Sequence, residues 1–260
     1  MLKRLPRRLS HGEEATLVEH LGELRARLVI SLLATFLPAA VIFVAFRQDL
    51  VELLIRPLPD DKTLVTLGVT EPFFTSLKVS FFAGLAIALP IVLYQLWSFL
   101  APAVDERTQR TVAIAAAFGA FLFAAGVAFA YVVVLPKALA FLTNFNEDLF
   151  DVDIRASYYF SFVLVALLGM GLVFEMPIFV LTLVRLRIVT AAQLRRNWRF
   201  GVVAVFLVAI LLPTVDPVSL AFEVVPLLAL YFLSVVLAGY MEKRWESAYD
   251  YDEENPYIPA

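Results

Sequence analysis

The sequence contains no cysteine, and only two of its 260 residues are histidine. Without cysteine, the chain can form no disulfide, no thiolate metal site and no cysteine nucleophile. His11 and His20 both precede the first long apolar run, so no helix carries the paired histidines of a zinc site. A glycine-rich phosphate loop and a nucleophile elbow are also missing. These absences predict a protein that is not an enzyme and that holds no metal and no cofactor.

Charge is scarce as well. Charged residues make up 17% of the chain and hydrophobic residues 61%, whereas soluble proteins are about a quarter charged and about half apolar. The formal net charge of −3 gives no reason to expect a nucleic-acid partner. The first residues are basic and then acidic, without the apolar core of a removable signal peptide. The composition therefore predicts an integral membrane protein in contact with lipid.

Apolar runs follow one another along the chain with short connections. We expect an all-α fold of six transmembrane helices, at about 28–46, 79–100, 112–135, 158–183, 200–212 and 218–240. The fifth run rises only about 20 Å, which is less than a hydrocarbon core of about 30 Å. It must thin the bilayer, include flanking residues such as Trp198, or fail to cross. The turn-forming segment 213–217 predicts a short hairpin between the last two runs.

Prolines recur inside or beside these runs, at Pro38, Pro90, Pro177 and Pro226. Proline kinks a membrane helix because neighbouring groups can satisfy the carbonyls it leaves free. We therefore expect curved helices that form a concave wall. The remaining organisation is predicted as a flexible segment over 1–16, a membrane domain over 17–244 and a disordered acidic tail over 245–260.

The distribution of basic residues predicts the orientation. Most of the 21 Lys and Arg residues fall before the first run, after the second and fourth, and after the sixth. Because basic loops stay on the cytoplasmic side, both termini are expected in the cytoplasm. If the fifth run did not cross, the tail would lie outside instead.

An amphipathic helix is expected immediately before the first run. Leu17, Leu21, Leu24 and Leu28 fall on one helical stripe, which predicts a helix at the cytoplasmic interface. Glu23 and Arg27 are four residues apart, the spacing of an ordinary ion pair on a helix surface. The residues alone favour that structural explanation.

Acidic residues inside apolar runs are the sharpest chemical feature of the sequence. Glu175 lies well within the fourth run and two residues before Pro177. A carboxylate there costs several kcal/mol unless it is protonated, paired or hydrated, so a functional role is favoured over a buried hydrogen bond. Glu223 and Asp216 are weaker candidates. A chain of acids also fits a proton-coupled transporter of small solutes that uses Glu175 and Glu223, which stays open as an alternative.

The segment 47–75 between the first two runs is too apolar to be a simple tether. Leu50, Leu53 and Leu54 predict a short surface helix, and Phe73 follows Glu71 and Pro72 as an aromatic anchor at the outer interface.

Four motifs follow one another along the chain, EHLGELRAR at 19–27, EPFFTSLK at 71–78, PIVLYQLWSFLAP at 90–102 and FEMP at 174–177. In this order and spacing they resemble the TatC family, the core subunit of the twin-arginine protein translocase. The resemblance extends from about Leu17 to Tyr240. It implies a receptor that recognises paired arginines of export signals and helps to carry folded proteins across the cytoplasmic membrane of a prokaryote, with energy from the proton-motive force.

The resemblance also implies roles for individual residues. In the family, a carboxylate of the first motif and an acidic residue of the first cytoplasmic loop bind the signal. The corresponding signal-binding residues here are Glu23, Arg25, Phe99 and Glu106. Two carboxylates suit two guanidinium groups, since each can accept both hydrogen bonds of one fork. The family's intramembrane glutamate corresponds to Glu175 and its outer-loop proline to Pro57.

Two departures from the family pattern are present. In the family, a Glu-Arg-type pair usually follows Ala-Pro-Ala by a few residues. Here the acidic residues come about two positions earlier, so Thr108 stands where an alignment without gaps would place the acid, and Glu106 is the expected acid instead. Before the last run, Asp216 and Ser219 match the family's docking site for partner helices, whereas its glutamine is absent. Glu223, one turn further on, is expected to replace the glutamine. The implied partners are single-span TatA/TatB-type proteins, twin-arginine signal peptides, other copies of the chain and membrane lipid.

Overall fold

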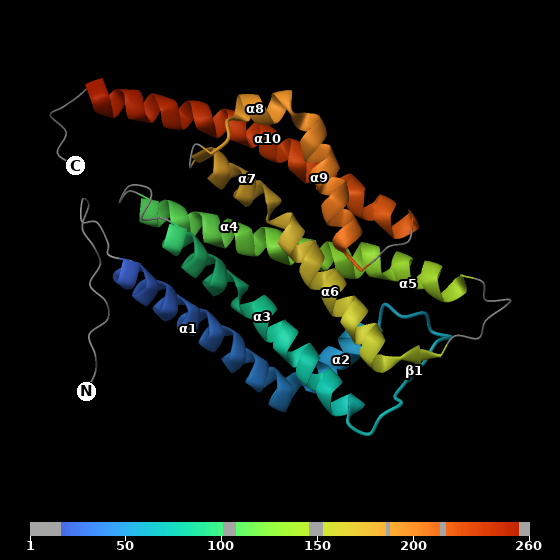
Figure 1. Cartoon of the computed structure of the whole chain (residues 1–260). Helices are drawn as coiled ribbons and strands as arrows, with labels where there is room; N and C mark the ends of the chain where they lie inside the picture. Colours follow the sequence, from blue (N-terminus) through green and yellow to red (C-terminus); the bar gives the residue numbers. More distant parts are fainter. Residues whose placement is uncertain (1–16, 101–107, 146–152, 186–187, 214–216, 255–260) are drawn as a thin grey trace, which may run out of the picture. The chain divides into compact units, whose positions relative to one another are not determined.

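The computed structural model describes residues 17–100, 108–145, 153–185, 188–213 and 217–254, and these are almost entirely helical (Figure 1). In chain order the elements are α1 (Leu17–Val41), the π-helical turn η1 (Ile42–Phe46), α2 (Arg47–Ile55), β1 (Leu64–Val65), α3 (Glu71–Leu100), α4 (Thr108–Phe129), the π-helical turn η3 (Ala130–Val134), α5 (Leu135–Asn144), β2 (Ile154–Arg155), α6 (Ala156–Phe174), α7 (Met176–Arg185), α8 (Ala191–Arg196), α9 (Trp198–Leu211) and α10 (Pro217–Glu254). The predicted all-α membrane fold is confirmed, with a minimal pair of strands added.

Within the described residues, five helical segments are long and apolar enough to cross a membrane. They are Leu21–Ile55, Glu71–Leu96, Ile114–Asn144, Ala156–Arg185 and Ser219–Arg244. The sixth apolar helix, α9, has 14 residues and begins at Trp198, so the flanking tryptophan belongs to the helix. At 1.5 Å per residue α9 rises only about 21 Å, which keeps it shorter than the hydrocarbon core.

The last helix extends into the acidic segment at the end of the chain. Helix α10 continues to Glu254, and therefore through the first ten residues of the segment 245–260. That segment contains Ala, Glu and no proline before Pro256, so nothing in it stops the helix, and an existing helix propagates at little cost. The disordered tail stays a prediction. Residues 255–260 and the segment 1–16 lie outside the described residues.

The chain divides into two compact units, and the first contains α1, η1, most of α3 and the start of α4. Helices α1 and α3 of this unit run antiparallel, with Phe36 against Phe81 at a ring distance of 5.5 Å and Phe43 against Phe73 at 5.8 Å. A Cβ atom on Gly84 would lie 2.6 Å from the Cβ atom of Ala39. Glycine at this position therefore lets the two helices approach closely.

The second unit contains the segment from Glu52 to Pro72 and the chain from Phe121 onward. Its α6 carries many buried side chains, and α10 packs against α7, α8 and α9. Strands β1 and β2 pair in parallel, with Leu64 opposite Ile154 and Val65 opposite Arg155. The last carbonyl groups of α2 accept hydrogen bonds from tyrosines, Leu53 from Tyr131 at 2.7 Å and Leu54 from Tyr159 at 2.7 Å. These bonds satisfy part of a helix end that would otherwise be unpaired.

Candidate functional site

An ion pair between Glu23 and Arg27 lies in α1, near the beginning of the first unit. In α1 the Nε atom of Arg27 donates a 3.0 Å hydrogen bond to Oε1 of Glu23, and Nη2 donates to the same oxygen. The Nη1 atom of Arg27 donates a 3.2 Å hydrogen bond to Oε1 of Gln95 in α3. The ion pair expected from the four-residue spacing is therefore present. It is also tied to a second helix, which the spacing alone did not predict.

The other predicted signal-binding residues differ in what the structure says of them. Arg25 is exposed, two residues from Glu23. Phe99 is half-buried and lies four residues after Gln95, on the same face of α3. Glu106 lies outside the described residues. The structure thus brings Glu23, Arg27 and Gln95 together and leaves the second acidic partner as a prediction.

Sequence reasoning missed Gln95 as a site residue. Its signal was a polar amide in an otherwise apolar stretch of α3, within the motif at 90–102. A polar group at such a position in a membrane helix needs a partner. Arg27 is the partner of Gln95 here. Because Arg27 lies one turn after Glu23, the pairing of Gln95 with this site could have been predicted.

Glu175 occupies the break between two helices of the second unit. Helix α6 ends at Phe174 and α7 begins at Met176, so Glu175 is the joining residue and Pro177 follows in the first turn of α7. Both carboxylate oxygens of Glu175 are buried, and neither has a hydrogen-bond partner among the residues that the structure describes. A buried carboxyl without a partner costs free energy, which marks this position as one that packing alone does not explain.

The residues expected to dock partner helices lie inside α10. Ser219 is 0% and Glu223 is 1% exposed, and they are one turn apart on the same face. Their burial differs from the surface position that direct docking requires. Asp216 lies outside the described residues.

The outer-loop residues form a well-connected structural corner in the second unit. Oε1 of Glu71 accepts hydrogen bonds from Nε of Arg155 at 3.0 Å and from the backbone N–H of Ser157 at 3.1 Å. Its Oε2 accepts a 3.0 Å bond from the backbone N–H of Leu67. The Glu71 carboxylate raises the pKa of the Arg155 guanidinium, so this pair remains charged at neutral pH. Glu71 therefore fixes the start of α6 to the segment before α3.

Two further outer-loop residues have simpler surroundings. Pro57 is half-buried in the turn that follows α2. Phe73 is exposed, and its ring contacts those of Phe43 and Phe74. An exposed aromatic cluster beside an apolar helix fits the expected anchor at the membrane interface.

Across the described part of the chain, no three His, Cys, Asp or Glu residues come together in a way that could hold a metal. The polar groups of the residues described above are carboxylates, amides and guanidinium groups.

Comparison with known proteins gives one consistent result. The family model "Sec-independent protein translocase protein (TatC)" matches residues 19–226. TatC of Helicobacter pylori (strain J99) is 34% identical over 219 residues, which cover 84% of this chain and 87% of that protein. TatCd of Bacillus subtilis (strain 168) is 36% identical over 233 residues, which cover 89% of this chain and 95% of the relative.

The same family appears among solved structures. A crystal structure of the twin-arginine translocase receptor TatC is similar with a TM-score of 0.73 and 34% identity, covering 84% of this chain and 99% of that one. None of these similarities supports the alternative of a small-solute transporter. Sequence, fold and relatives agree, and this chain belongs to the TatC family of Sec-independent protein translocase proteins.

Proposed function

We propose that the chain is the receptor for twin-arginine signal peptides in a translocase that exports folded proteins. The observation that supports this most directly is the Glu23 carboxylate, which already accepts two N–H groups of an arginine fork. Arginine forks and carboxylates match in geometry, and their hydrogen bonds are roughly twice as strong as neutral ones. A site that holds Arg27 has the chemistry to hold an arginine of an arriving signal.

Binding of a signal would proceed by exchange. The Glu23–Arg27 pair is half-exposed, with 30% of the Glu23 side chain and 22% of the Arg27 side chain accessible. Pairs of this kind contribute about 0–1 kcal/mol, so an incoming guanidinium group can displace Arg27 at little cost. Gln95 then keeps a hydrogen bond to Arg27. We propose Glu106 as the acid that receives the second arginine, with Arg25 and Phe99 at the edge of the same surface.

Charge removal at Glu23 tests this role. Glu23→Gln keeps the shape and the amide can still accept one hydrogen bond, but the charge that attracts a guanidinium group is lost. We expect export of a twin-arginine reporter to be abolished while the protein still inserts into the membrane. Glu52→Gln is the matched control, because Glu52 is an exposed carboxylate near the other end of the same helical run. Normal export by the Glu23→Gln variant would contradict the proposed receptor role.

Glu175 is proposed as a polar site within the membrane. Its two oxygens lack partners among the described residues, so a polar group that reaches the break between α6 and α7 would gain hydrogen bonds that no protein group now supplies. The signal peptide or a partner helix in transit is the proposed source of that group.

Single-span TatA/TatB-type proteins and other copies of the chain are the proposed partners. Because Ser219 and Glu223 are buried, we propose that a partner helix first packs against exposed neighbours on α10. Phe222 is 41% and Val225 is 68% exposed, and both flank Glu223 in the sequence. The buried pair would then become accessible only if the elements packed against α10 move apart.

The proposed setting is the cytoplasmic membrane of a prokaryote, with six crossings and both termini in the cytoplasm. The role needs no chemical catalysis. Energy would come from the proton-motive force, since moving one charge through 100 mV of membrane potential supplies about 2.3 kcal/mol. Helix α9 would cross by thinning the bilayer around it.

A further inference from the structure

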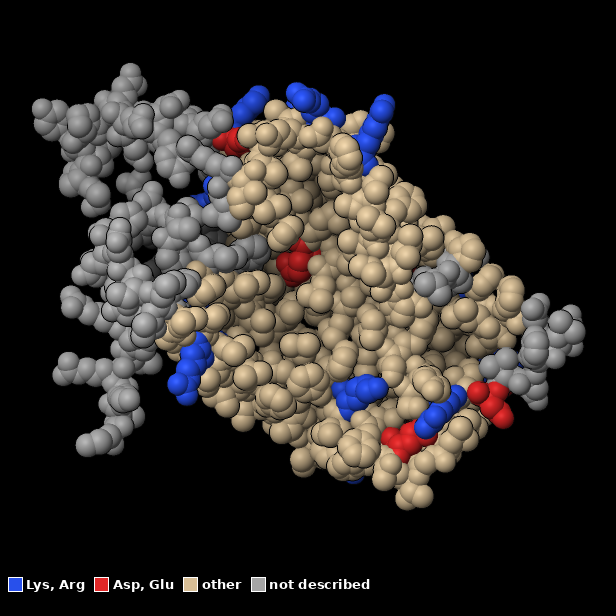
Figure 2. All heavy atoms as spheres, in the orientation of Figure 1, with Lys and Arg blue, Asp and Glu red and all other residues tan. Residues whose placement is uncertain are grey.

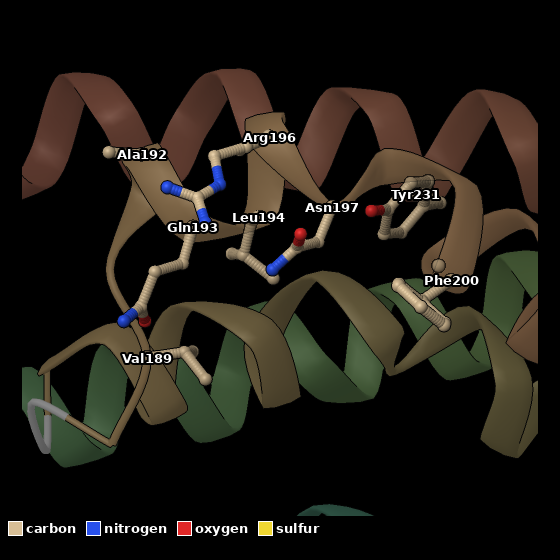
Figure 3. A pocket seen from close by; sticks show the side chains of 9 residues that line it. Val189, Ala192, Gln193, Leu194, Arg196, Asn197, Phe200 and Tyr231 are labelled. Carbon is tan, nitrogen blue, oxygen red and sulfur yellow. The ribbon is translucent and has the colours of Figure 1, made fainter.

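A mixed cavity lies in the second unit where α8, α9 and α10 meet. Its volume is about 460 Å³, and its lining includes Gln193, Arg196, Asn197, Phe200, Gly201 and Tyr231. Figure 3 shows Gln193 and Arg196 at one end, Phe200 and Tyr231 at the other, and Asn197 between them. The cavity therefore has a polar end with a positive charge and an apolar end. None of these residues belongs to the signal-binding surface described above.

Local packing holds the walls of this cavity in place. The Thr190 side chain accepts a 3.1 Å bond from the Gln193 backbone N–H, while the Gln193 side chain accepts a 3.0 Å bond from the Thr190 N–H. The backbone N–H of Ala191 donates to Glu242 of α10 at 3.0 Å. Tyr231 is 5% exposed and forms the floor beside Gly201. These contacts fix α8 on α10, so the cavity is a built feature and not a gap in a loop.

The charge at the polar end favours an anion. Among the described residues nothing pairs with the Arg196 guanidinium, and the side-chain N–H groups of Gln193 and Asn197 also donate to no protein group. The two neighbouring arginines are engaged elsewhere, since Arg195 lies over Gly239 and Arg199 lies 6.0 Å from the Trp198 ring. The Glu242 carboxylate of α10 accepts a hydrogen bond from the backbone N–H of Ala191 in α8, and it does not line the cavity. Arg196, Gln193 and Asn197 each offer side-chain N–H donors to the polar end of the cavity, and donors of this kind suit a phosphate group.

The apolar end continues onto an exposed apolar stripe of α9. Phe200 is 76%, Val203 56% and Leu207 60% exposed, and these residues lie on one face of the helix. Figure 2 shows several Lys and Arg side chains, with an acidic side chain beside them, around the position where Figure 1 places α8. In the proposed six-span topology the bilayer thins beside the short α9, and the cavity at the first residues of α9 then lies at the depth of lipid headgroups.

We propose that this cavity binds one anionic phospholipid, with the phosphate on Arg196, Gln193 and Asn197 and an acyl chain along Phe200 and the exposed stripe of α9. Phosphate chemistry alone would also accept free inorganic phosphate. The apolar end and the continuous stripe favour the lipid, because a free ion would leave both of them unused. The proposal rests on the proposed six-span topology and does not depend on the signal-receptor role.

The test uses the full chain with Trp198 as its single tryptophan, after Trp97→Phe and Trp245→Phe. Purified protein in detergent is titrated with phosphatidylglycerol or phosphatidylcholine carrying brominated acyl chains, and quenching of Trp198 fluorescence is measured. We expect saturable quenching with a clear preference for phosphatidylglycerol. Arg196→Gln should lower the phosphatidylglycerol affinity about five-fold, the size of one basic contact with an anionic headgroup, and should remove the preference. Arg199→Gln removes the same charge outside the cavity and should keep it.

Three results would overturn the proposal. Equal losses in Arg196→Gln and Arg199→Gln would mean diffuse attraction and no site. Equal affinity of the two lipids for the unmodified cavity would overturn it without any variant, which covers the case that Arg196→Gln does not fold. Prevention of quenching by millimolar inorganic phosphate would identify the free ion as the ligand. Arg196→Lys should retain part of the preference, since it keeps the charge and loses the fork.

Discussion

Arg27 is the residue whose role the structure changes most. On the sequence it is the second half of a helix-surface ion pair, but its guanidinium group bonds both Glu23 and Gln95. It therefore occupies the same carboxylate that a signal arginine would use. Under the proposed receptor role Arg27 competes with the signal, and its hydrogen bonds orient the Glu23 carboxylate while no signal is bound.

Removal of this competitor should tighten signal binding. Arg27→Gln leaves the Glu23 carboxylate without its internal partner, and a half-exposed pair is worth about 0–1 kcal/mol. We expect the affinity for a fluorescent twin-arginine peptide to rise by up to about five-fold, measured by anisotropy. Arg47→Gln, at the far end of the same helical run, should leave the affinity unchanged. A fall comparable with that of Glu23→Gln would show instead that Arg27 is needed to build the site.

Glu175 should trade stability against function. Replacing a buried carboxyl that has no partner by a side chain of similar size and no polarity removes its desolvation penalty. We expect Glu175→Leu to raise the free energy of unfolding by about 1–3 kcal/mol and to lower export of a twin-arginine reporter. Glu175→Gln keeps a polar group and is expected to gain less stability. Lower stability of Glu175→Leu in a denaturant titration would mean that the carboxyl has a stabilising partner.

At the scale of helices, close approaches at glycine determine the packing of the second unit. The short helix α9 contacts α10 where a Cβ atom on Gly201 would lie 2.1 Å from the Tyr231 ring. Contact this close leaves no space for any larger residue. The amino-acid pattern predicted a hairpin of the last two apolar runs, and this pair of residues shows how its two helices are held together.

A methyl group at Gly201 should therefore separate the two helices. Overpacking of this kind costs about 1–3 kcal/mol, so Gly201→Ala is expected to lower the thermal unfolding temperature. If the two residues meet, Gly201→Ala should cost less stability in a chain that already carries Tyr231→Ala than it costs in the unmodified chain. Additive losses in a double-mutant cycle would show that the two residues do not meet.

Helices were easier to predict than the polar contacts between them. Long apolar runs identify membrane helices because lipid excludes unpaired backbone groups, and the break at Glu175 followed from Pro177. The β1–β2 pair and the Glu71–Arg155 bond could not be predicted, since they join residues 84 or more positions apart. The extension of α10 to Glu254 could not be predicted either, because the acidic composition of the segment says nothing of the helix that it extends.

At the scale of the whole chain, a family resemblance supplied what physical reasoning could not. Composition and basic-residue distribution predicted a multi-spanning helical protein, and the comparisons confirm the family. From spacing alone, Glu23 and Arg27 gave only an ordinary ion pair. The proposed role of this pair in a receptor surface came from the family resemblance of the motif at 19–27. The roles of all the predicted site residues stay predictions, and Glu106 and Asp216 lie outside the described residues.

The proposed function requires that Glu23 and its neighbours bind the arginines of an arriving signal peptide. A photoreactive amino acid replaces Leu24, which is 42% exposed beside Glu23, or Leu53, which is 40% exposed in α2 and serves as the control. Membranes are then incubated with a reporter carrying a twin-arginine signal or its twin-lysine version. The account predicts a crosslink from position 24 that weakens strongly with lysine, which lacks the fork, and none from position 53. Equal crosslinking of both signals at position 24, or crosslinking as strong from position 53, would contradict it.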